Sequence, residues 1–392
     1  MLAWEVLRNI SPWKRPFHLW RQTLARLWLK LYPKVEVIAI TGSVGKTTTK
    51  EMIAQVLQER FRVVKSEANL DPVFNIPRTI LKLRPGDQKL VLEMGVEYPQ
   101  EMDFYLSLVQ PKIGVVTKIA CVHTEFLGDL SGVVEEKSKL LRSLPQGGWA
   151  ILNWDDFSTR QLASKTKAKV FYYGVDDKNC QLTAGNIKTS AEGVDFTLSS
   201  KEFTRGEVEV RLNLLGRHNV YCALAASSVG LISGLSLKEI KNGLEKVKPQ
   251  PSRLNVLSGP KQSIIIDDSY NASPTGTQAA LETLKDYPGK RKIAVLGEMR
   301  ELGSYSEKGH REVGKKVAGE KIDYLLTLGN LTKFIIDEAK AQGFKKEHLF
   351  QFKTAEEIEK KLKDLLGQGD IVLIKGSRAM RMERIISGLK LA

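Results

Sequence analysis

The sequence predicts an α/β protein with two successive, mainly parallel-sheet domains after a short helical segment. A β-branched apolar run, residues 35–40, leads through a glycine-rich turn into a helix-period pattern. Apolar runs of strand length then alternate with helical stretches along most of the chain. A proline-containing stretch at residues 248–251 marks a domain boundary. We therefore expect three parts: residues 1–34, 35–250 and 251–392.

The stretch Val37–Lys50, VIAITGSVGKTTTK, predicts a phosphate-binding loop. Gly42 and Gly45 let backbone N–H groups approach an anion, and the helix that follows points its N-terminus at the same place. Lys46 can reach the β- and γ-phosphates, and the Thr47 hydroxyl is placed to bind Mg²⁺. An isoleucine replaces the first glycine of the usual pattern, but strand, turn, Lys-Thr pair and helix coincide. The sequence therefore predicts a P-loop ATPase domain.

Two further polar side chains follow predicted strands. Glu93 ends the strand expected at Lys89–Met94, and His123 comes shortly after the strand expected at Lys112–Thr117. Because catalytic residues of open α/β sheets collect at the carboxyl ends of strands, we expect Thr47, Glu93 and His123 to converge on one metal–phosphate site. Taken singly, the glutamate could be a surface acid and the histidine an ordinary loop residue.

Two predicted helices of the first domain carry further candidates. The helix expected at Val133–Leu144 carries Lys137, and residues 216–219 open a small-residue helix at Val220–Gly230. Alternating segments up to Leu215 predict a mixed or antiparallel sheet edge.

In the second domain, apolar runs predict buried strands at Ser263–Ile266, Ile293–Leu296 and Ile371–Ile374. One helix opens with a capping box formed by Thr354 and Glu357.

The composition limits the class of protein. The 392 residues carry a formal charge of +15, and 42% of them are hydrophobic. The three cysteines are scattered, which favours a reduced, cytoplasmic compartment and no structural zinc. A positive net charge is common in nucleic-acid-binding proteins, but the sequence contains no RNA- or DNA-binding motif in which aromatic residues alternate with basic ones. We therefore expect no nucleic-acid partner.

Residues 1–34 form a distinct segment with seven Lys or Arg residues, one acid and four of the six tryptophans. Trp20, Leu24, Leu27, Trp28 and Leu31 are expected to share a helical face, and basic residues interrupt any run long enough for a signal peptide or a membrane span. Two interpretations stay open. The helix could lie on an anionic membrane surface and hold the protein peripherally on the inner face, or it could dock on its own domain.

Seven sequence blocks stand out along residues 35–392. They are TGSVGKTTTK (41–50), LEMG around Glu93, the His123 to Lys137 spacing, GRHN (216–219), DDSYNASP (267–274), LGEMRELG (296–303) and KGSRAMRME (375–383). In this order the blocks resemble the Mur ligases, which are ATP-dependent amide-forming enzymes of peptidoglycan precursor synthesis. The last three blocks are most similar to the branch that adds D-alanyl-D-alanine, the MurF branch.

This resemblance implies a C-terminal Rossmann-like domain that closes over the ATPase domain, and it implies a reaction. A substrate carboxylate takes the γ-phosphoryl group of ATP to give an acyl phosphate, and an amine then forms the amide. The catalytic residues would be Lys46, His123 and Lys137. Phosphoryl transfer needs charge neutralisation, which Lys46 and two Mg²⁺ ions held by Thr47, Glu93 and His123 would supply. The lysine that matches Lys137 becomes a carbamate in this family, which would make it an anionic metal ligand.

The resemblance also implies the remaining site residues. Asn69, Lys375, Ser377 and Arg378 would contact substrate, while His310 is either functional or a helix cap. The nucleotide-binding residues would be Thr41, Gly42, Ser43, Gly45, Lys46, Thr47, Thr48, His218, Asn219, Arg253, Asp268, Tyr270 and Asn271.

Three departures from the family pattern bear on the substrate. The family's N-x-N-N-x-x-G-x-P loop, residues 69–77 of this chain, keeps only its first Asn and its Pro. Cys222 stands where a second Asn would follow Asn219, so fewer contacts to adenine are expected. Residues 1–34 stand in place of the family's N-terminal UDP-sugar domain, which leaves a UDP-muramoyl peptide open as substrate.

Three functions follow as hypotheses. The first is a MurF-like ligase, of the UDP-N-acetylmuramoyl-tripeptide–D-alanyl-D-alanine ligase type, and the second is a ligase of the same chemistry outside peptidoglycan. The third is a membrane-associated nucleotide-binding scaffold, against which the intact Lys46, Glu93 and Lys137 argue. We expect the first, acting as a monomer on a carboxylate and an amine that are small molecules or peptides.

Overall fold

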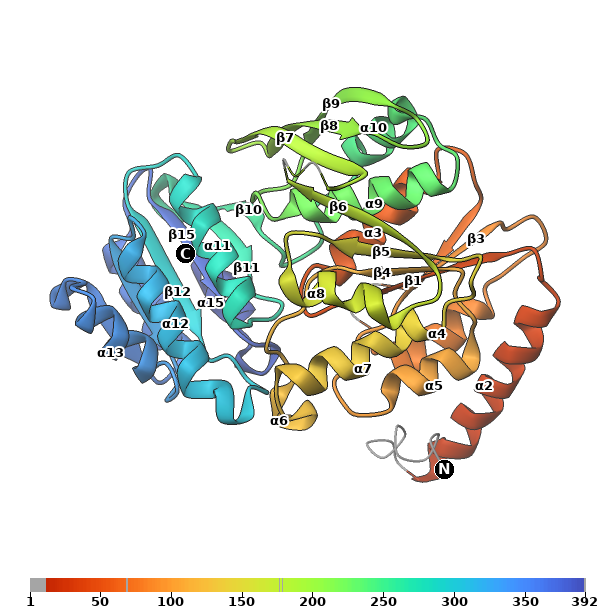
Figure 1. Ribbon diagram of the computed structural model, residues 1–392. Helices are drawn as coiled ribbons and strands as arrows, with labels where there is room; N and C mark the ends of the chain where they lie inside the picture. Colours follow the sequence, from red (N-terminus) through yellow and green to blue (C-terminus); the bar gives the residue numbers. More distant parts are fainter. Residues whose placement is uncertain (1–11, 68–69, 176, 178, 391–392) are drawn as a thin grey trace. The chain divides into compact units, whose positions relative to one another are not determined.

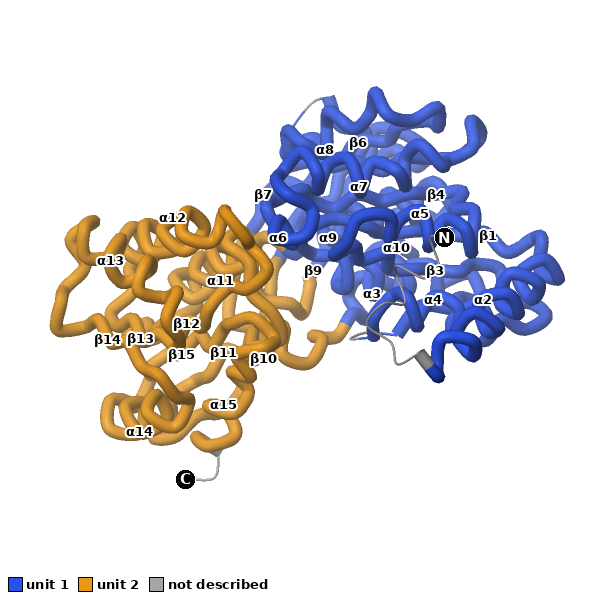
Figure 2. Tube along the Cα trace, turned by 90° about the horizontal axis from the view of Figure 1, so that it is seen from below, with its two compact units in different colours: residues 1–187, 195–211, 219–247 blue, residues 188–194, 212–218, 248–392 orange. Residues whose placement is uncertain are grey.

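The computed structural model describes residues 12–67, 70–175, 177 and 179–390 (Figure 1). By their internal contacts these residues divide into two compact units, coloured separately in Figure 2. The change of unit between Val247 and Lys248 lies close to the boundary expected after residue 250. Two short segments, 188–194 and 212–218, also belong to the second unit, although the sequence placed them in the first domain.

The first unit is built on a sheet that has nine strands in the described part of the chain. β1 pairs in parallel with β3 on one side and with β4 on the other. The parallel pairing continues outward to β2 and through β5 and β6 to β7. The strands, from edge to edge, are β2 (Val63–Lys65), β3 (Lys89–Glu93), β1 (Glu36–Thr41), β4 (Ile113–Val116), β5 (Trp149–Asn153), β6 (Lys169–Val175), β7 (Leu182–Thr189), β8 (Val194–Ser200) and β9 (Gly206–Leu212).

The far edge of this sheet is antiparallel. β7, β8 and β9 are successive neighbours joined by connections of four and five residues, and the Ser190 N–H donates to the Gly193 carbonyl at 2.8 Å, as in the turn of a hairpin. The sheet is therefore mixed, as the alternating segments of the sequence predicted.

Helices cover the sheet of the first unit. α9 is apolar on all sides and buried along nearly its whole length, and it packs against α3, β5 and β6. The helices are α2 (Arg15–Lys30), α3 (Lys46–Leu57), α4 (Pro72–Ile80), α5 (Glu101–Leu108), α6 (Thr124–Leu127), α7 (Leu130–Arg142), α8 (Phe157–Gln161), α9 (Asn219–Ile232) and α10 (Leu237–Glu245).

The second unit contains a sheet of six strands in the described residues, parallel except where β10 pairs with β11. Its helices pack on the sheet through two separate apolar clusters. One cluster contains residues of α11, α12 and α13, and the other contains residues of α14 and α15. In sheet order the strands are β10 (Asn255–Ser258), β11 (Ile264–Asp268), β15 (Ile371–Lys375), β12 (Lys292–Gly297), β13 (Tyr324–Leu328) and β14 (Leu349–Phe352). The helices are α11 (Pro274–Asp286), α12 (Ser306–Gly319), α13 (Lys333–Ala341), α14 (Ala355–Leu365) and α15 (Glu383–Lys390).

The N-terminal helix α2 docks on the first unit, beside α4 and α5 (Figure 1). Ala25 is fully buried, and Trp28 donates a hydrogen bond from Nε1 to the Leu83 carbonyl at 3.2 Å. Trp20 and Leu27 remain exposed. The expected apolar face is therefore present through Trp20, Leu24, Leu27 and Leu31, and only Trp28 was placed on it wrongly. At about 100° per residue Trp28 lies at the border between the two sides of the helix, where it packs on the core.

The capping box predicted for α14 is present. The Glu357 N–H donates to Thr354 Oγ1 at 3.3 Å, and the Thr354 N–H donates to the Glu357 carboxylate at 3.0 Å. These two bonds satisfy donors that the first turn of a helix otherwise leaves unpaired.

We expect Thr354→Ala to lower the free energy of unfolding of the second unit by about 0.5–2 kcal/mol, because the substitution removes the acceptor for the Glu357 N–H. Thr354→Ser keeps that acceptor and should change stability far less. Chemical denaturation followed by circular dichroism measures both. Equal losses in the two variants would contradict the role of the cap.

Candidate active site

The loop after β1 needs glycine at two positions. Gly42 has φ of +143°, and a Cβ atom there would lie 2.0 Å from Thr117 Oγ1. Gly45 has φ of +82° and precedes Lys46, the first residue of α3. A side chain at either position would be strained, and at Gly42 it would also clash. The loop therefore brings its backbone into a space that only glycine permits.

Hydrogen bonds from the segment after β4 fix the loop. The Ser43 N–H donates to the Lys118 carbonyl at 2.6 Å, and Thr117 Oγ1 donates to the Val44 carbonyl at 2.7 Å. The Ser43 hydroxyl also bonds the backbone of Ala120, at 2.9 Å. The loop is thus a pre-ordered anion cradle at the N-terminus of α3.

Lys46 lies across this cradle. Its Nζ donates to the carbonyls of Gly42 at 3.0 Å and Ser43 at 3.3 Å. Thr41 Oγ1 donates to the Met94 carbonyl at 2.8 Å, which ties the end of β1 to the chain beyond β3. Thr48 is the third residue of α3, so the first turn of the helix directs its N–H groups and positive dipole end toward the loop.

Thr47 and Glu93 meet, as the sequence predicted. Thr47 Oγ1 donates to Glu93 Oε1 at 3.0 Å, and parallel register places Glu93 beside Ile40 of β1. The Glu93 N–H donates to Ser66 Oγ at 3.0 Å, which holds the end of β3. A hydroxyl and a carboxylate are hard oxygen donors, so this pair fits Mg²⁺.

Lys50 is a member of the site that the sequence analysis missed. It is fully buried, and its Nζ lies 3.2 Å from Glu51 Oε1 and 3.7 Å from Glu93 Oε2. Within the described chain this Nζ has no hydrogen-bond partner of good geometry. Its position in the sequence could have indicated this role, because Lys50 follows Thr47 by three residues and both side chains therefore lie on one face of α3.

Lys137 on α7 is also fully buried, and its Nζ has no hydrogen-bond partner among the described residues. Burial, together with the positive charge of Lys46, lowers the pKa of Lys137 to about 7. Burial likewise raises the pKa of nearby Glu101 to about 7. A substantial fraction of the Lys137 amine is therefore unprotonated near neutral pH, and only the unprotonated amine is a nucleophile.

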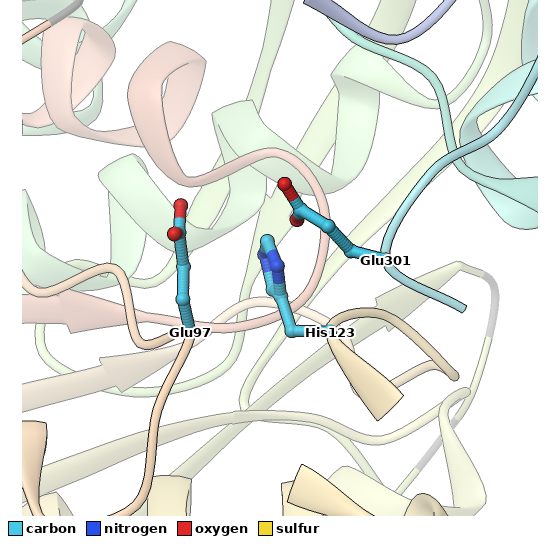
Figure 3. Close-up of side chains that lie close together, drawn as sticks. All are labelled: Glu97, His123 and Glu301. Carbon is cyan, nitrogen blue, oxygen red and sulfur yellow. The ribbon is translucent and has the colours of Figure 1, made fainter. Parts of the chain in front are cut away.

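His123 lies beside a second residue that the sequence analysis missed. A carboxylate oxygen of Glu97, in the loop after β3, lies within 4.8 Å of a ring nitrogen of His123, in the loop after β4 (Figure 3). His123 has φ of +54° and immediately precedes α6. The loops after β3 and β4 thus bring together a carboxylate and an imidazole, two side chains of the types that can hold a metal ion. Glu301, also labelled in Figure 3, belongs to the other unit.

The start of α9 adjoins the loop. Asn219 is the first residue of α9 and is buried. Cys222, one turn later, lies with Sγ 3.8 Å from the Gly45 carbonyl oxygen. The residue that departs from the family pattern therefore packs on the phosphate-binding loop.

Several predicted residues cluster within the second unit. Lys375 Nζ lies 2.5 Å from Asp268 Oδ2 and donates to the Asn271 carbonyl at 2.9 Å. The Arg253 guanidinium lies over the Tyr270 ring, 4.4 Å from its centroid. The register of β11 and β15 explains the first contact, since Asp268 pairs with Lys375.

The remaining predicted residues have other surroundings. Ser377 is buried, and its hydroxyl accepts a hydrogen bond from the Arg300 N–H at 2.8 Å, so it joins two loops. Arg378 is exposed and pairs with Glu383 at 3.4 Å. Asn69 lies outside the described residues.

Two histidines of the second unit, His310 and His218, have different surroundings. His310 is fully buried and ties the Met299 N–H, 3.1 Å from Nε2, to the Ser306 carbonyl, 2.7 Å from Nδ1, so it is a structural bridge. His218 lines a cavity of about 240 Å³ together with Arg217, and burial lowers its pKa.

The fold and this site define a P-loop nucleotide-binding protein with an appended Rossmann-like unit. Comparison with known proteins agrees. The family described as "Mur ligase middle domain" matches residues 40–230, and the one described as "Mur ligase, glutamate ligase domain" matches residues 252–378. The chain belongs to the Mur ligase family.

Its relatives include MurF ligases. The chain is 35% identical over 367 residues to UDP-N-acetylmuramoyl-tripeptide–D-alanyl-D-alanine ligase of Escherichia coli (strain K12), covering 93% of this chain and 78% of that protein. It superposes on MurF from Acinetobacter baumannii with a TM-score of 0.87 and 29% identity, covering 96% of this chain and 81% of that one. MurF ligase from Thermotoga maritima in complex with ADP gives a TM-score of 0.82 and 26% identity, covering 95% and 83%.

We expect Lys50→Met to weaken the apparent affinity for Mg²⁺ in ATP turnover by about 10- to 100-fold, because Glu93 loses the cation that orients it. Lys65→Met is the matched control, since Lys65 is partly exposed and pairs with Glu51. Magnesium titrations of both variants, with thermal unfolding to confirm the fold, make the comparison. Equal affinities in the two variants would contradict the role of Lys50.

Proposed function

We propose that the chain catalyses ATP-dependent amide bond formation of the MurF type, joining D-alanyl-D-alanine to a UDP-N-acetylmuramoyl-tripeptide. The observation that carries this proposal is the contact of Thr47 with Glu93 at a cradle crossed by Lys46. The chain that carries this contact is 35% identical to a UDP-N-acetylmuramoyl-tripeptide–D-alanyl-D-alanine ligase, which supports this activity over other ligase activities.

The proposed reaction has two steps. An oxygen of the tripeptide carboxylate attacks the γ-phosphorus of ATP, the bond to the β-phosphate oxygen breaks, and ADP leaves. The amine of the dipeptide then attacks the carbonyl carbon of the acyl phosphate. The tetrahedral intermediate expels inorganic phosphate, and the amine nitrogen loses a proton to give the amide.

Each residue of the cradle has a role in the first step. The loop N–H groups and Lys46 would bind the phosphates and balance the charge that spreads over the transferred oxygens. Thr47 and Glu93 would hold one Mg²⁺ ion, and His123, with Glu97 beside it, would hold the second. Bound magnesium would neutralise phosphate charge.

We further propose that Lys137 acts as a carbamate. Its amine is buried and has no partner in the described residues, so the neutral form that reacts with CO₂ is accessible. The neutral amine nitrogen attacks CO₂ and loses one proton to give the carbamate anion, so that two protons leave in all when the lysine starts as the ammonium cation. That anion would complete the metal ligands at a position where a permanently charged lysine is costly.

Residues of the second unit would serve the remaining groups. Asp268, Tyr270, Asn271 and Arg253 would approach the ribose and phosphates, and Lys375 would face the substrates, as the family resemblance implies. We also propose that the enzyme acts as a monomer in the cytoplasm.

The test is phosphate release from ATP and Mg²⁺ with a panel of carboxylates and amines. We expect release to require both a UDP-N-acetylmuramoyl-tripeptide and D-alanyl-D-alanine, and a tripeptide without the UDP-sugar tests whether that group is recognised. Lys46→Ala should reduce the rate by about 10²–10³, while Lys112→Ala, at the opposite end of β4, should not. Release that ignores either substrate would contradict the proposal.

We expect Lys137→Ala to lose about 10²–10³ in rate and to regain part of it when small carboxylic acids are added, since a free carboxylate can replace the carbamate. Lys137→Arg places a permanent cation at this position, cannot form a carbamate, and should not regain activity when carboxylic acids are added. A ¹³C carbamate signal from wild-type protein in ¹³C-bicarbonate, lost in Lys137→Ala, is the direct readout. Full activity of Lys137→Ala, or no such signal in the wild type, would contradict the carbamate.

A further inference from the structure

α2 presents two different faces. One face packs on the apolar core beneath α4 and α5 through Ala25, Leu29 and Tyr32. This packing fixes the rotation of the helix about its axis, so the identity of the outward side chains is determined by the fold.

The outward face is an uninterrupted apolar stripe. Its members follow at intervals of four, three, four, three and four residues, which is the spacing of one side of a helix. At 1.5 Å per residue the stripe is about 27 Å long. Half of the ten large exposed hydrophobic side chains in the described chain lie on it. On α2 the stripe consists of Phe17 (57% exposed), Trp20 (61%), Leu24 (partly buried) and Leu27 (55%), and it continues through Trp13 (91%) in the 3₁₀ turn before the helix and Leu31 (67%) directly after it.

Basic residues flank the stripe without any acid. Between Pro12 and Val35 the sequence contains six Lys or Arg residues and no Asp or Glu, which is a net charge of +6. Lys14, Lys30 and Lys34 are exposed. A face of this kind is complementary to a negatively charged surface.

We propose that this face of α2 binds the surface of an anionic lipid bilayer, with the helix lying in the plane of the interface. Tryptophan and phenylalanine favour the headgroup level, and the flanking lysines favour anionic lipid. The stripe is the side of a single helix rather than a groove that would hold a peptide. If a second copy of the chain covered this face, two surfaces that each carry a net charge of +6 would meet and repel each other. No described helix is long and apolar enough to cross a membrane, so the contact is peripheral.

Vesicle sedimentation of the full chain tests this inference. At low salt we expect binding to phosphatidylcholine vesicles that contain phosphatidylglycerol, little binding to phosphatidylcholine alone, and at least about tenfold weaker binding in high salt, as exposed charges are screened. Failure to bind the anionic vesicles at low salt would overturn the proposal.

Variants distinguish binding through the stripe from nonspecific adsorption of the protein to vesicles. Combining Trp13→Ala, Trp20→Ala and Leu27→Ala should weaken vesicle binding at least about tenfold and leave thermal unfolding and ATP turnover unchanged. Phe157→Ala, an equally exposed aromatic on α8, should bind like wild type. Unchanged binding of the triple variant would overturn the assignment. So would self-association in analytical ultracentrifugation that the triple variant abolishes without any vesicle binding, because the occupant would then be a second copy.

Discussion

The parallel pairing of β1 with β3 on one side and β4 on the other is the constraint on which the candidate site depends. Parallel strands end at the same edge of a sheet, so the phosphate-binding loop, Glu93 and His123 follow three adjacent strand ends. The contact of Thr47 with Glu93 follows from that register. Helices supply the remaining candidates of the first unit, which are Lys46, Thr47 and Lys50 from α3, Lys137 from α7 and Asn219 from α9.

The site concentrates positive charge that the described protein only partly balances. Lys46, Lys50 and Lys137 all come close to the loop or to Glu93, and two of them are fully buried. Burying cations in this way is costly for the protein alone. A triphosphate would add several negative charges at the cradle, and the proposed carbamate would convert one of the cations into an anion. The Nζ atoms of Lys50 and Lys137 have no hydrogen-bond partner among the described residues, although Lys50 lies near two carboxylates, which is consistent with a site completed by ligand.

The features that depend on local sequence pattern could be predicted from the sequence alone. The β-branched run of β1, the glycines of the loop and the capping box of α14 act through short-range sterics and hydrogen bonds, so their positions could be predicted. The meeting of Thr47 with Glu93 could be predicted because the ends of parallel strands coincide.

Features that depend on long-range packing could not be predicted. Burial of Lys50, the approach of Glu97 to His123 and the inward turn of Trp28 each depend on elements distant in the sequence. Segments 188–194 and 212–218 join the second unit through contacts that no local pattern indicates.

Transfer of a phosphoryl group to a carboxylate is the central claim, and an isotope measurement tests it most directly. With both carboxylate oxygens of the tripeptide substrate labelled with ¹⁸O, one labelled oxygen should appear in each molecule of released inorganic phosphate, because that oxygen attacks phosphorus and leaves with it. Mass spectrometry of the phosphate measures the label. Amide product formed together with unlabelled phosphate would contradict the account, since the phosphoryl group would then have passed to water.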